Sequence, residues 1–74
     1  MRLTAYMAAT RVTGNEIARK SGINPSIVSK MLAGKSQPTA RTIRRLIDHY
    51  PMLTAGGIFA DYFEAAEDAV DDTI

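Results

Sequence analysis

The segment from residue 14 to residue 33 places the strongest constraint on how this chain can fold. It reads GNEIARKSGINPSIVSKMLA, which predicts two short helices, over residues 14–21 and 25–33, on either side of Gly22. Two helices that cross at a tight corner need a small residue where they touch and a residue that tolerates positive φ in the turn. Ala18 and Gly22 meet these needs, so the sequence predicts a helical corner.

Both helices of this corner begin with capping signals. Thr13 and Glu16 match a capping box, in which the Thr hydroxyl accepts from the amide of Glu16 and the Glu carboxylate accepts from the amide of Thr13. Asn24 is a favourable N-cap, and Pro25 suits the first helical position, where its missing N–H costs nothing. Local residues therefore predict where each helix starts.

Three further helices follow from apolar side chains spaced three or four residues apart. They are predicted over residues 2–11, from the cap at Thr39 to Pro51, and over residues 58–69. The last one is placed after Gly56 and Gly57, because glycine costs about 1 kcal/mol relative to alanine inside a helix. The predicted fold is all-α, a compact bundle of about five short helices. The expected inward side chains are Leu3, Tyr6 or Met7 and Thr10 in the first helix, and Ile43, Leu46, Ile47 and Tyr50 in the fourth.

Length and composition exclude several kinds of site. The 74 residues make one domain with a thin core, and the absence of cysteine removes disulfides and thiolate metal sites. His49 is the single histidine, and it points about 100° away from its neighbour Asp48 around a helix, so the two form no catalytic pair. We expect no metal, no cofactor and no catalytic residue. The sequence shows neither a secretory signal nor a bilayer-spanning run, so we expect a cytoplasmic protein without a membrane partner.

Charge is strongly polarised along the chain. Residues 1–50 contain all nine Lys and Arg and two acids, a net charge of +7, whereas residues 51–74 contain six acids and no base, a net charge of −6. A basic body beside an acidic end predicts a polyanionic partner for the basic part. The sequence thus divides into residues 1–53, with the helical corner, and residues 54–74, an acidic amphipathic helix and tail. This second part belongs to the same domain or forms a dimer contact.

The segment TGNEIARKSGINPSIVSKMLAGKSQPT resembles the lambda-repressor and Cro-like (XRE-type) helix-turn-helix family of DNA-binding domains, and the resemblance covers about residues 2–53. It rests on a Thr with a capping acid, an aliphatic–Ala pair, a turn Gly followed by an aliphatic residue, a polar helix start, an aliphatic–Ser pair, and Gly-Lys followed by Pro. In this family the second helix of the corner enters the major groove of double-stranded DNA. The resemblance implies base contacts from Asn24, Pro25, Ser26, Ser29 and Lys30, and phosphate contacts from Asn15, Lys35, Ser36, Gln37, Thr39 and Arg41.

Two positions depart from the family pattern. Family members often have a Gln that touches phosphate at the position of Gly14. They often have a long polar residue that reads a base at the position of Pro25. Pro25 offers only its ring to a thymine methyl, so base readout depends on Lys30, which can donate to guanine O6 and N7, and on short Ser and Asn contacts. We therefore expect modest direct specificity, helped by DNA shape.

Three features of the sequence each allow more than one interpretation. The aromatic stripe of Phe59, Tyr62 and Phe63 is either core or a dimer contact. The acids between residues 61 and 72 are either a solvated exterior, or a device that repels DNA or folds over Arg44 and Arg45. These two arginines either touch phosphate, lie on a solvated face or pair with the acidic end.

Together these features predict a sequence-specific regulator of transcription of the phage Cro or repressor type. It would bind operator DNA as a homodimer, act by occupying the operator, and reside with the nucleoid of a bacterial host cell. It would need no small-molecule ligand and would not be an enzyme. The alternative is a protein-interaction module, antitoxin-like or binding an antirepressor or polymerase, with DNA binding secondary.

Overall fold

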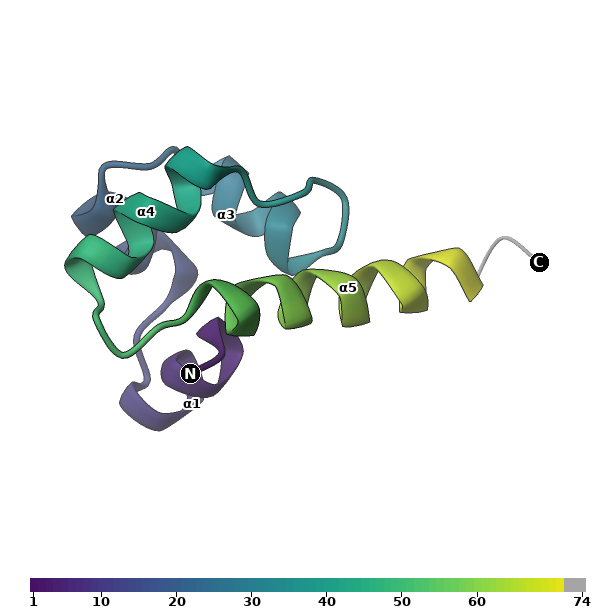
Figure 1. The fold of residues 1–74 in the computed structure, drawn as a ribbon, viewed down its shortest axis with the longest axis horizontal. Helices are drawn as coiled ribbons and strands as arrows, with labels where there is room; N and C mark the ends of the chain where they lie inside the picture. The colour runs from purple at the N-terminus through teal and green to yellow at the C-terminus, as the bar shows by residue number, and fades with distance from the viewer. Residues whose placement is uncertain (72–74) are drawn as a thin grey trace.

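The computed structural model describes residues 1–71 and is all-helical over that range (Figure 1). Its helices are α1 (Leu3–Thr10), α2 (Gly14–Ser21), α3 (Pro25–Leu32), α4 (Ala40–His49) and α5 (Ala55–Asp71). Residues 1–71 include no strand, so the predicted all-α bundle of about five helices is confirmed. The last part of the predicted acidic tail, residues 72–74, lies outside the described residues.

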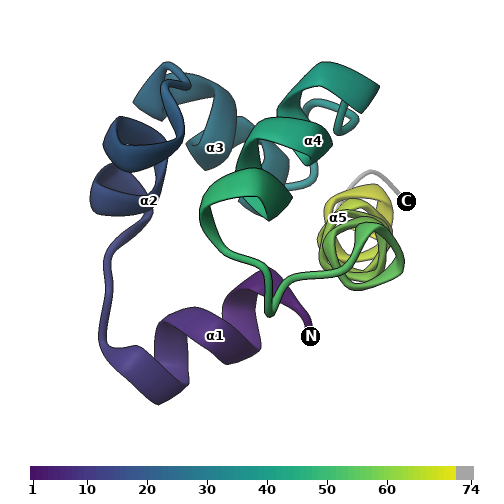
Figure 2. The same ribbon diagram turned by 60° about the vertical axis from the view of Figure 1, so that its left-hand side comes forward.

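The five helices surround one core. α2 packs against α3 and α4, while α5 contacts α1, α3 and α4 (Figure 2). The second half of α5 extends beyond the other helices (Figure 1). No helix within the described residues is both long and apolar enough to cross a membrane. The largest fully buried side chains come from several elements: Leu3, Ile17, Leu46, Leu53, Ile58 and Val28.

α1 is shorter than predicted at both ends. The chain leaves helical geometry at Arg11, whose φ of 59° is left-handed. Leu3 is buried, and Tyr6 and Met7 both pack against the core. The prediction that Thr10 faces inward is wrong, because this residue is exposed and its hydroxyl donates to the carbonyl oxygen of Tyr6 at 2.7 Å.

α2, α3 and α4 begin where the capping residues predict. The hydroxyl of Thr13 accepts from the amide of Glu16 at 3.2 Å, although the return bond from the amide of Thr13 to the Glu16 carboxylate is not formed among the described residues. Asn24 caps α3, and Thr39 accepts from the amide of Thr42 at the start of α4. The predicted inward side chains of α4 all belong to the core or pack against it: Ile43, Leu46, Ile47 and Tyr50.

Tyr50 brings a polar group into this core. Its ring meets the ring of Tyr6 edge-on, with centroids 5.3 Å apart, and its buried hydroxyl has no hydrogen-bond partner within the described part of the chain. Burial raises the pKa of Tyr50, and the nearby Tyr6 and Glu16 raise it further, because each disfavours the phenolate. The phenol therefore stays neutral in the folded protein over a wider pH range than in the unfolded chain.

The predicted start of α5 is wrong. The helix begins at Ala55, three residues earlier than residue 58, and includes both Gly56 and Gly57. The hydroxyl of Thr54 caps it by accepting from the amide of Gly57 at 3.0 Å, and the amide of Thr54 donates to the carbonyl oxygen of Met1 at 3.2 Å. A Cβ at Gly57 would lie 2.6 Å from that carbonyl oxygen, so only glycine fits. Contact with the distant N-terminal residue explains a glycine that helix propensity alone disfavours.

Two acids of α5 hold the N-terminal helix. The buried carboxylate of Asp61 accepts from the amide of Thr4 at 3.0 Å and from its hydroxyl at 2.7 Å. It supplies the cap that α1 lacks, since Arg2 makes no side-chain cap. Glu64 forms an ion pair with Arg2 at 2.7 Å. The interpretation as a solvated exterior is therefore wrong for Asp61, whereas Glu64 stays exposed and forms its ion pair at the surface.

The aromatic stripe of α5 is not core. Phe63 is 55% exposed, while Ile58 and Asp61 are the buried residues of this part of the helix. Phe59 and Tyr62 are half-buried, and their rings lie 5.9 Å and 5.4 Å from the ring of Phe63. The interpretation as core fails because α5 turns a neighbouring face toward α1. The role of these residues as a dimer contact stays a prediction.

Candidate nucleic-acid interface

The corner between α2 and α3 is closed by backbone hydrogen bonds around Gly22. This residue has φ 71°, its amide donates to the carbonyl oxygen of Arg19, and the amide of Ile23 donates to that of Ala18 at 2.8 Å. These two bonds make the Schellman ending, which requires a left-handed residue and therefore favours glycine. Ala18 is fully buried at the crossing, as predicted. The corner fixes the direction in which α3 leaves the bundle.

α4 braces this corner through Arg45. Its guanidinium donates to the carbonyl oxygen of Gly22 at 2.7 Å, so the side chain bridges the turn and the fourth helix. Arg45 is half-buried, holds the turn at the surface and pairs with no described acid, while its contact with phosphate stays a prediction. Arg44 is exposed and forms no ion pair with a described acid.

α3 and its N-cap present the predicted base-contacting residues to solvent. Asn24, Pro25, Ser26, Ser29 and Lys30 are all exposed. The carboxamide oxygen of Asn24 accepts from both the amide and the hydroxyl of Ser26 at 3.0 Å. This oxygen is occupied as a cap, which leaves the Asn24 amide group as its donor toward a ligand. All five residues are therefore open to solvent along α3, with Asn24 in the hollow toward α4 and Pro25 and Ser29 in the hollow toward the start of α2.

The loop after α3 repeats the geometry of the corner. Gly34 has φ 74°, its amide donates to the carbonyl oxygen of Met31, and the amide of Lys35 donates to that of Lys30 at 2.9 Å. A Cβ at Gly34 would lie 2.4 Å from the backbone nitrogen of Ala66. α5 therefore passes directly against this glycine and supports the loop.

The predicted phosphate-contacting residues lie beside this face. Lys35, Gln37, Thr39 and Arg41 are exposed, Ser36 is half-buried, and Asn15 is exposed in the first turn of α2. The hydroxyl of Thr39 accepts from the amide of Thr42 and donates to its hydroxyl at 3.0 Å, so Thr39 already has a structural role as the cap of α4. The exposed N-terminal turn of α4 adds backbone donors that suit a phosphate.

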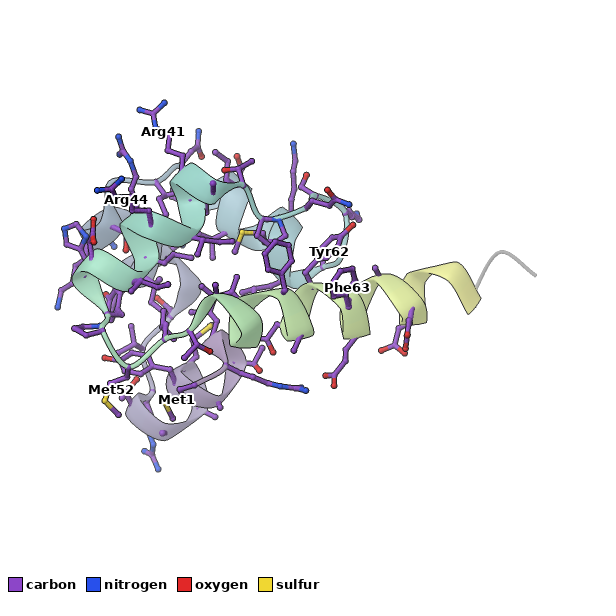
Figure 3. The ribbon with its side chains drawn as sticks, in the orientation of Figure 1. Met1, Arg41, Arg44, Met52, Tyr62 and Phe63 are labelled. Atoms are coloured by element: carbon purple, nitrogen blue, oxygen red, sulfur yellow. The ribbon has the colours of Figure 1, made fainter. Side chains whose placement is uncertain are left out.

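Positive charge gathers around the same surface. Arg41 and Arg44 project from α4 away from α5 (Figure 3), and Lys30 and Lys35 lie on α3 and the following loop. Among the described side chains, the one ion pair joins Arg2 to Glu64 of α5. These four cations are free to meet an anionic ligand. Exposed cations on the same elements as a slim polar helix face match the needs of duplex DNA, whose phosphates bind cations and whose base edges present polar groups.

One residue of this surface was missed by the sequence analysis. Ile27 on α3 is 42% exposed, whereas Val28 and Met31 on the same helix are buried. The sequence feature that could have identified Ile27 is its position on the edge of the polar face, three residues after Asn24 and three before Lys30. Its exposure depends on how far α4 stands from α3, which the sequence pattern does not give.

Comparison with protein families agrees with this geometry. The sequence model of a family described as a helix-turn-helix domain matches residues 1–54. These residues include the corner and the whole surface just described. No curated protein and no solved structure matched significantly. The chain therefore belongs to the helix-turn-helix domain family, of the XRE and Cro-like kind.

Proposed function

We propose that this protein is a sequence-specific, double-stranded DNA-binding regulator of transcription of the phage Cro or repressor type, which acts by occupying its operator. One observation carries the proposal: the outer face of α3 is open, narrow and polar, and the next loop and α4 carry exposed cations that pair with none of the described acids. Membership of a helix-turn-helix family supports it.

In this proposal α3 lies in the major groove along its polar face. Lys30 donates to guanine O6 and N7, Ser26 and Ser29 make short contacts to base edges, and the ring of Pro25 lies against a thymine methyl. Lys35, Gln37 and Arg41 bind the phosphates of the flanking strand, together with Asn15, Ser36 and Thr39. Only Lys30 in this set has a long side chain on the base-facing side, so direct readout is modest and DNA shape contributes.

We also propose that two copies bind one operator. A two-fold dimer of helix-turn-helix domains reads half-sites about 34 Å apart, one turn of the duplex. The aromatic stripe of Phe59, Tyr62 and Phe63 on α5 supports this pairing. Phe63 is 55% exposed, and Phe59 and Tyr62 are half-buried, so a partner that covered the stripe would remove apolar surface from water. Phe63→Ser should weaken cooperative filling of a two-half-site operator, while Met52→Ser, which changes another exposed apolar residue, should not.

The experiment that tests DNA binding is selection of bound sequences from random duplexes, followed by affinity measurements against salt for the winning sequence. The logarithm of the association constant should fall linearly with the logarithm of salt concentration, by about 0.9 for each phosphate neutralised. Absence of a complex with any duplex at low ionic strength contradicts the proposal.

Two lysines separate base readout from phosphate binding. Lys30→Ala should relax base preference at one position and cost about 1–3 kcal/mol on the selected sequence, because it removes a contact to a base edge. Lys35→Ala should weaken binding to every sequence alike and reduce the salt slope by about 1. Equal effects of both variants on all sequences would remove Lys30 from the base-reading face.

The aromatic stripe also suits a second candidate function. An exposed apolar strip on an acidic helix is a feature of a protein-interaction module, in which an antirepressor, a toxin or polymerase binds α5 and DNA binding is secondary. Sedimentation of the full chain with operator DNA distinguishes the two. A homodimer on DNA supports the regulator, whereas a monomer at tens of micromolar with operator present favours the protein-interaction module.

A further inference from the structure

Ile27 occupies an unusual place for a large aliphatic side chain. It lies on α3 between Asn24 and Lys30, one helical turn from each, and 42% of its surface is exposed. The apolar residues that follow it on α3 serve the core. Ile27 lies at the edge of the polar, solvent-facing side of the helix, where a serine or threonine would expose less apolar surface to water.

The surroundings of Ile27 form an open groove between the α2–α3 corner and the start of α4. Its volume is about 580 Å³, and Ile23 and Ile27 supply its apolar part. The rest of the lining is polar or cationic and contains no acid: Asn24, Gln37, Thr39, Arg41 and Arg45 with Gly22, Ser36 and Thr42. An apolar spot inside a cationic rim favours an anionic ligand that carries an apolar group.

We propose that Ile27 is a specificity-determining residue that packs against the 5-methyl group of a thymine. This inference rests on the proposed function, since it places the groove over one strand of bound DNA. The thymine methyl is the apolar group on the major-groove edge of the base pairs, and it lies near the sugar–phosphate wall of its own strand. Ile27 lies one helical turn before Lys30, the predicted base contact, and lines the same groove as Arg41, the predicted phosphate contact. A protein partner would need acidic groups to match the same rim.

The methyl group can be removed without changing base pairing, which gives a direct test. Each thymine of the selected duplex is replaced in turn by deoxyuridine, and the affinity of the full chain is measured for each duplex. For the wild type, one replacement in each half-site should weaken binding about fourfold, the equivalent of burying one methyl-sized group. Ile27→Ala should bind the thymine duplex about as weakly as the wild type binds the uracil duplex, and should not distinguish the two.

Two controls separate this effect from others. Met52→Ala, which removes another exposed apolar side chain, should keep the full uracil penalty. Thermal unfolding of Ile27→Ala should match the wild type, because Ile27 belongs neither to the buried core nor to the half-buried residues packed against it.

The outcomes also separate this inference from the proposed function. A uracil penalty that is identical in the wild type and Ile27→Ala overturns the inference, as does a duplex in which no thymine is sensitive. Loss of self-association in Ile27→Ala with unchanged methyl dependence also overturns it and assigns the residue to a protein contact. Absence of binding to any duplex overturns DNA binding as a whole.

Discussion

At the scale of single residues, the core of this small protein carries a polar group that contributes no hydrogen bond. The ring of Tyr50 packs against Tyr6, but its hydroxyl is buried and unpartnered within residues 1–71. A buried polar atom without a partner costs about 1–3 kcal/mol. The packing of the ring therefore stabilises the fold, and the burial of the unpaired hydroxyl destabilises it.

Tyr50→Phe should consequently leave the free energy of unfolding unchanged or raise it by about 1 kcal/mol. The pH dependence gives a second readout. The pKa of Tyr50 is raised in the folded state, so the unfolded chain loses this proton first and wild-type stability falls as the pH rises above about 10. Urea denaturation at neutral and at alkaline pH should show that the free energy of unfolding falls less with pH for Tyr50→Phe than for the wild type. A clear destabilisation at neutral pH would mean that the hydroxyl has a partner.

Asp61 is the opposite case, a buried polar side chain with both oxygens in use. It accepts from the amide and the hydroxyl of Thr4 in the first turn of α1, where a negative charge also meets the positive end of the helix. Asp61→Ala should lower the free energy of unfolding by about 2 kcal/mol, the upper range for loss of a cap. Asp68→Ala, an exposed acid on the same helix, should change it by less than about 0.5 kcal/mol. Equal effects in denaturant titrations would contradict the capping role.

At the scale of elements, two glycines end successive helices in the same left-handed geometry but have different neighbours. A Cβ at Gly22 would meet the end of the Arg45 side chain at 3.1 Å, whereas a Cβ at Gly34 would meet the backbone of α5 at 2.4 Å. A flexible guanidinium can move, but helix backbone cannot. Gly34 therefore serves as a contact between α3 and α5 as well as a turn.

Alanine substitutions at Gly22 and at Gly34 should lower the free energy of unfolding by different amounts. Gly22→Ala should cost about 1–2 kcal/mol, from the left-handed conformation alone. Gly34→Ala carries the same strain and must also push α5 away from the loop, so its cost should exceed that of Gly22→Ala by at least about 1 kcal/mol. Thermal unfolding of the two variants checks the order. Equal losses would show that α5 does not press on Gly34.

The same distinction explains how much of the fold the sequence could predict. The starts of α2, α3 and α4 depend on caps within three residues, at Thr13, Asn24 and Thr39, and they lie where predicted. The start of α5 depends on Met1, more than fifty residues away, and its prediction was wrong. The capping role of Asp61 is equally non-local. The sequence pattern predicted the short-range hydrogen bonds that cap helices, and it did not predict the contacts between distant segments.

The candidate interface follows the same rule. Exposure of Ser26, Ser29 and Lys30 follows from helical spacing alone, because the opposite face of α3 carries the apolar residues. The exposure of Ile27 and the use of Arg45 as a brace depend on where α4 lies, so they required the structure.

At the scale of the whole molecule, charge is separated in space as well as in sequence. The cations Arg41 and Arg44 project from one side, and α5, with its exposed acids Glu67 and Asp68, runs along the other and extends beyond the bundle (Figure 3). The longest axis of the molecule is 38 Å. At 0.01 M salt the screening length is about 30 Å, comparable with this dimension, whereas at 0.15 M it is about 8 Å. The acidic end can therefore act on DNA at the basic face only when salt is low.

Neutralising this end should change non-specific DNA binding in a salt-dependent way. Glu67→Gln combined with Asp68→Asn removes two negative charges, so affinity for a random duplex should rise severalfold at 0.01 M salt and become equal to the wild type at 0.15 M. A charge-conserving control, Glu67→Asp with Asp68→Glu, should match the wild type at both salt concentrations. Fluorescence anisotropy with a labelled duplex provides the measurement. A gain that persists at 0.15 M would place these acids at the DNA contact itself, and no gain at 0.01 M would show that the acidic end does not orient the protein on DNA.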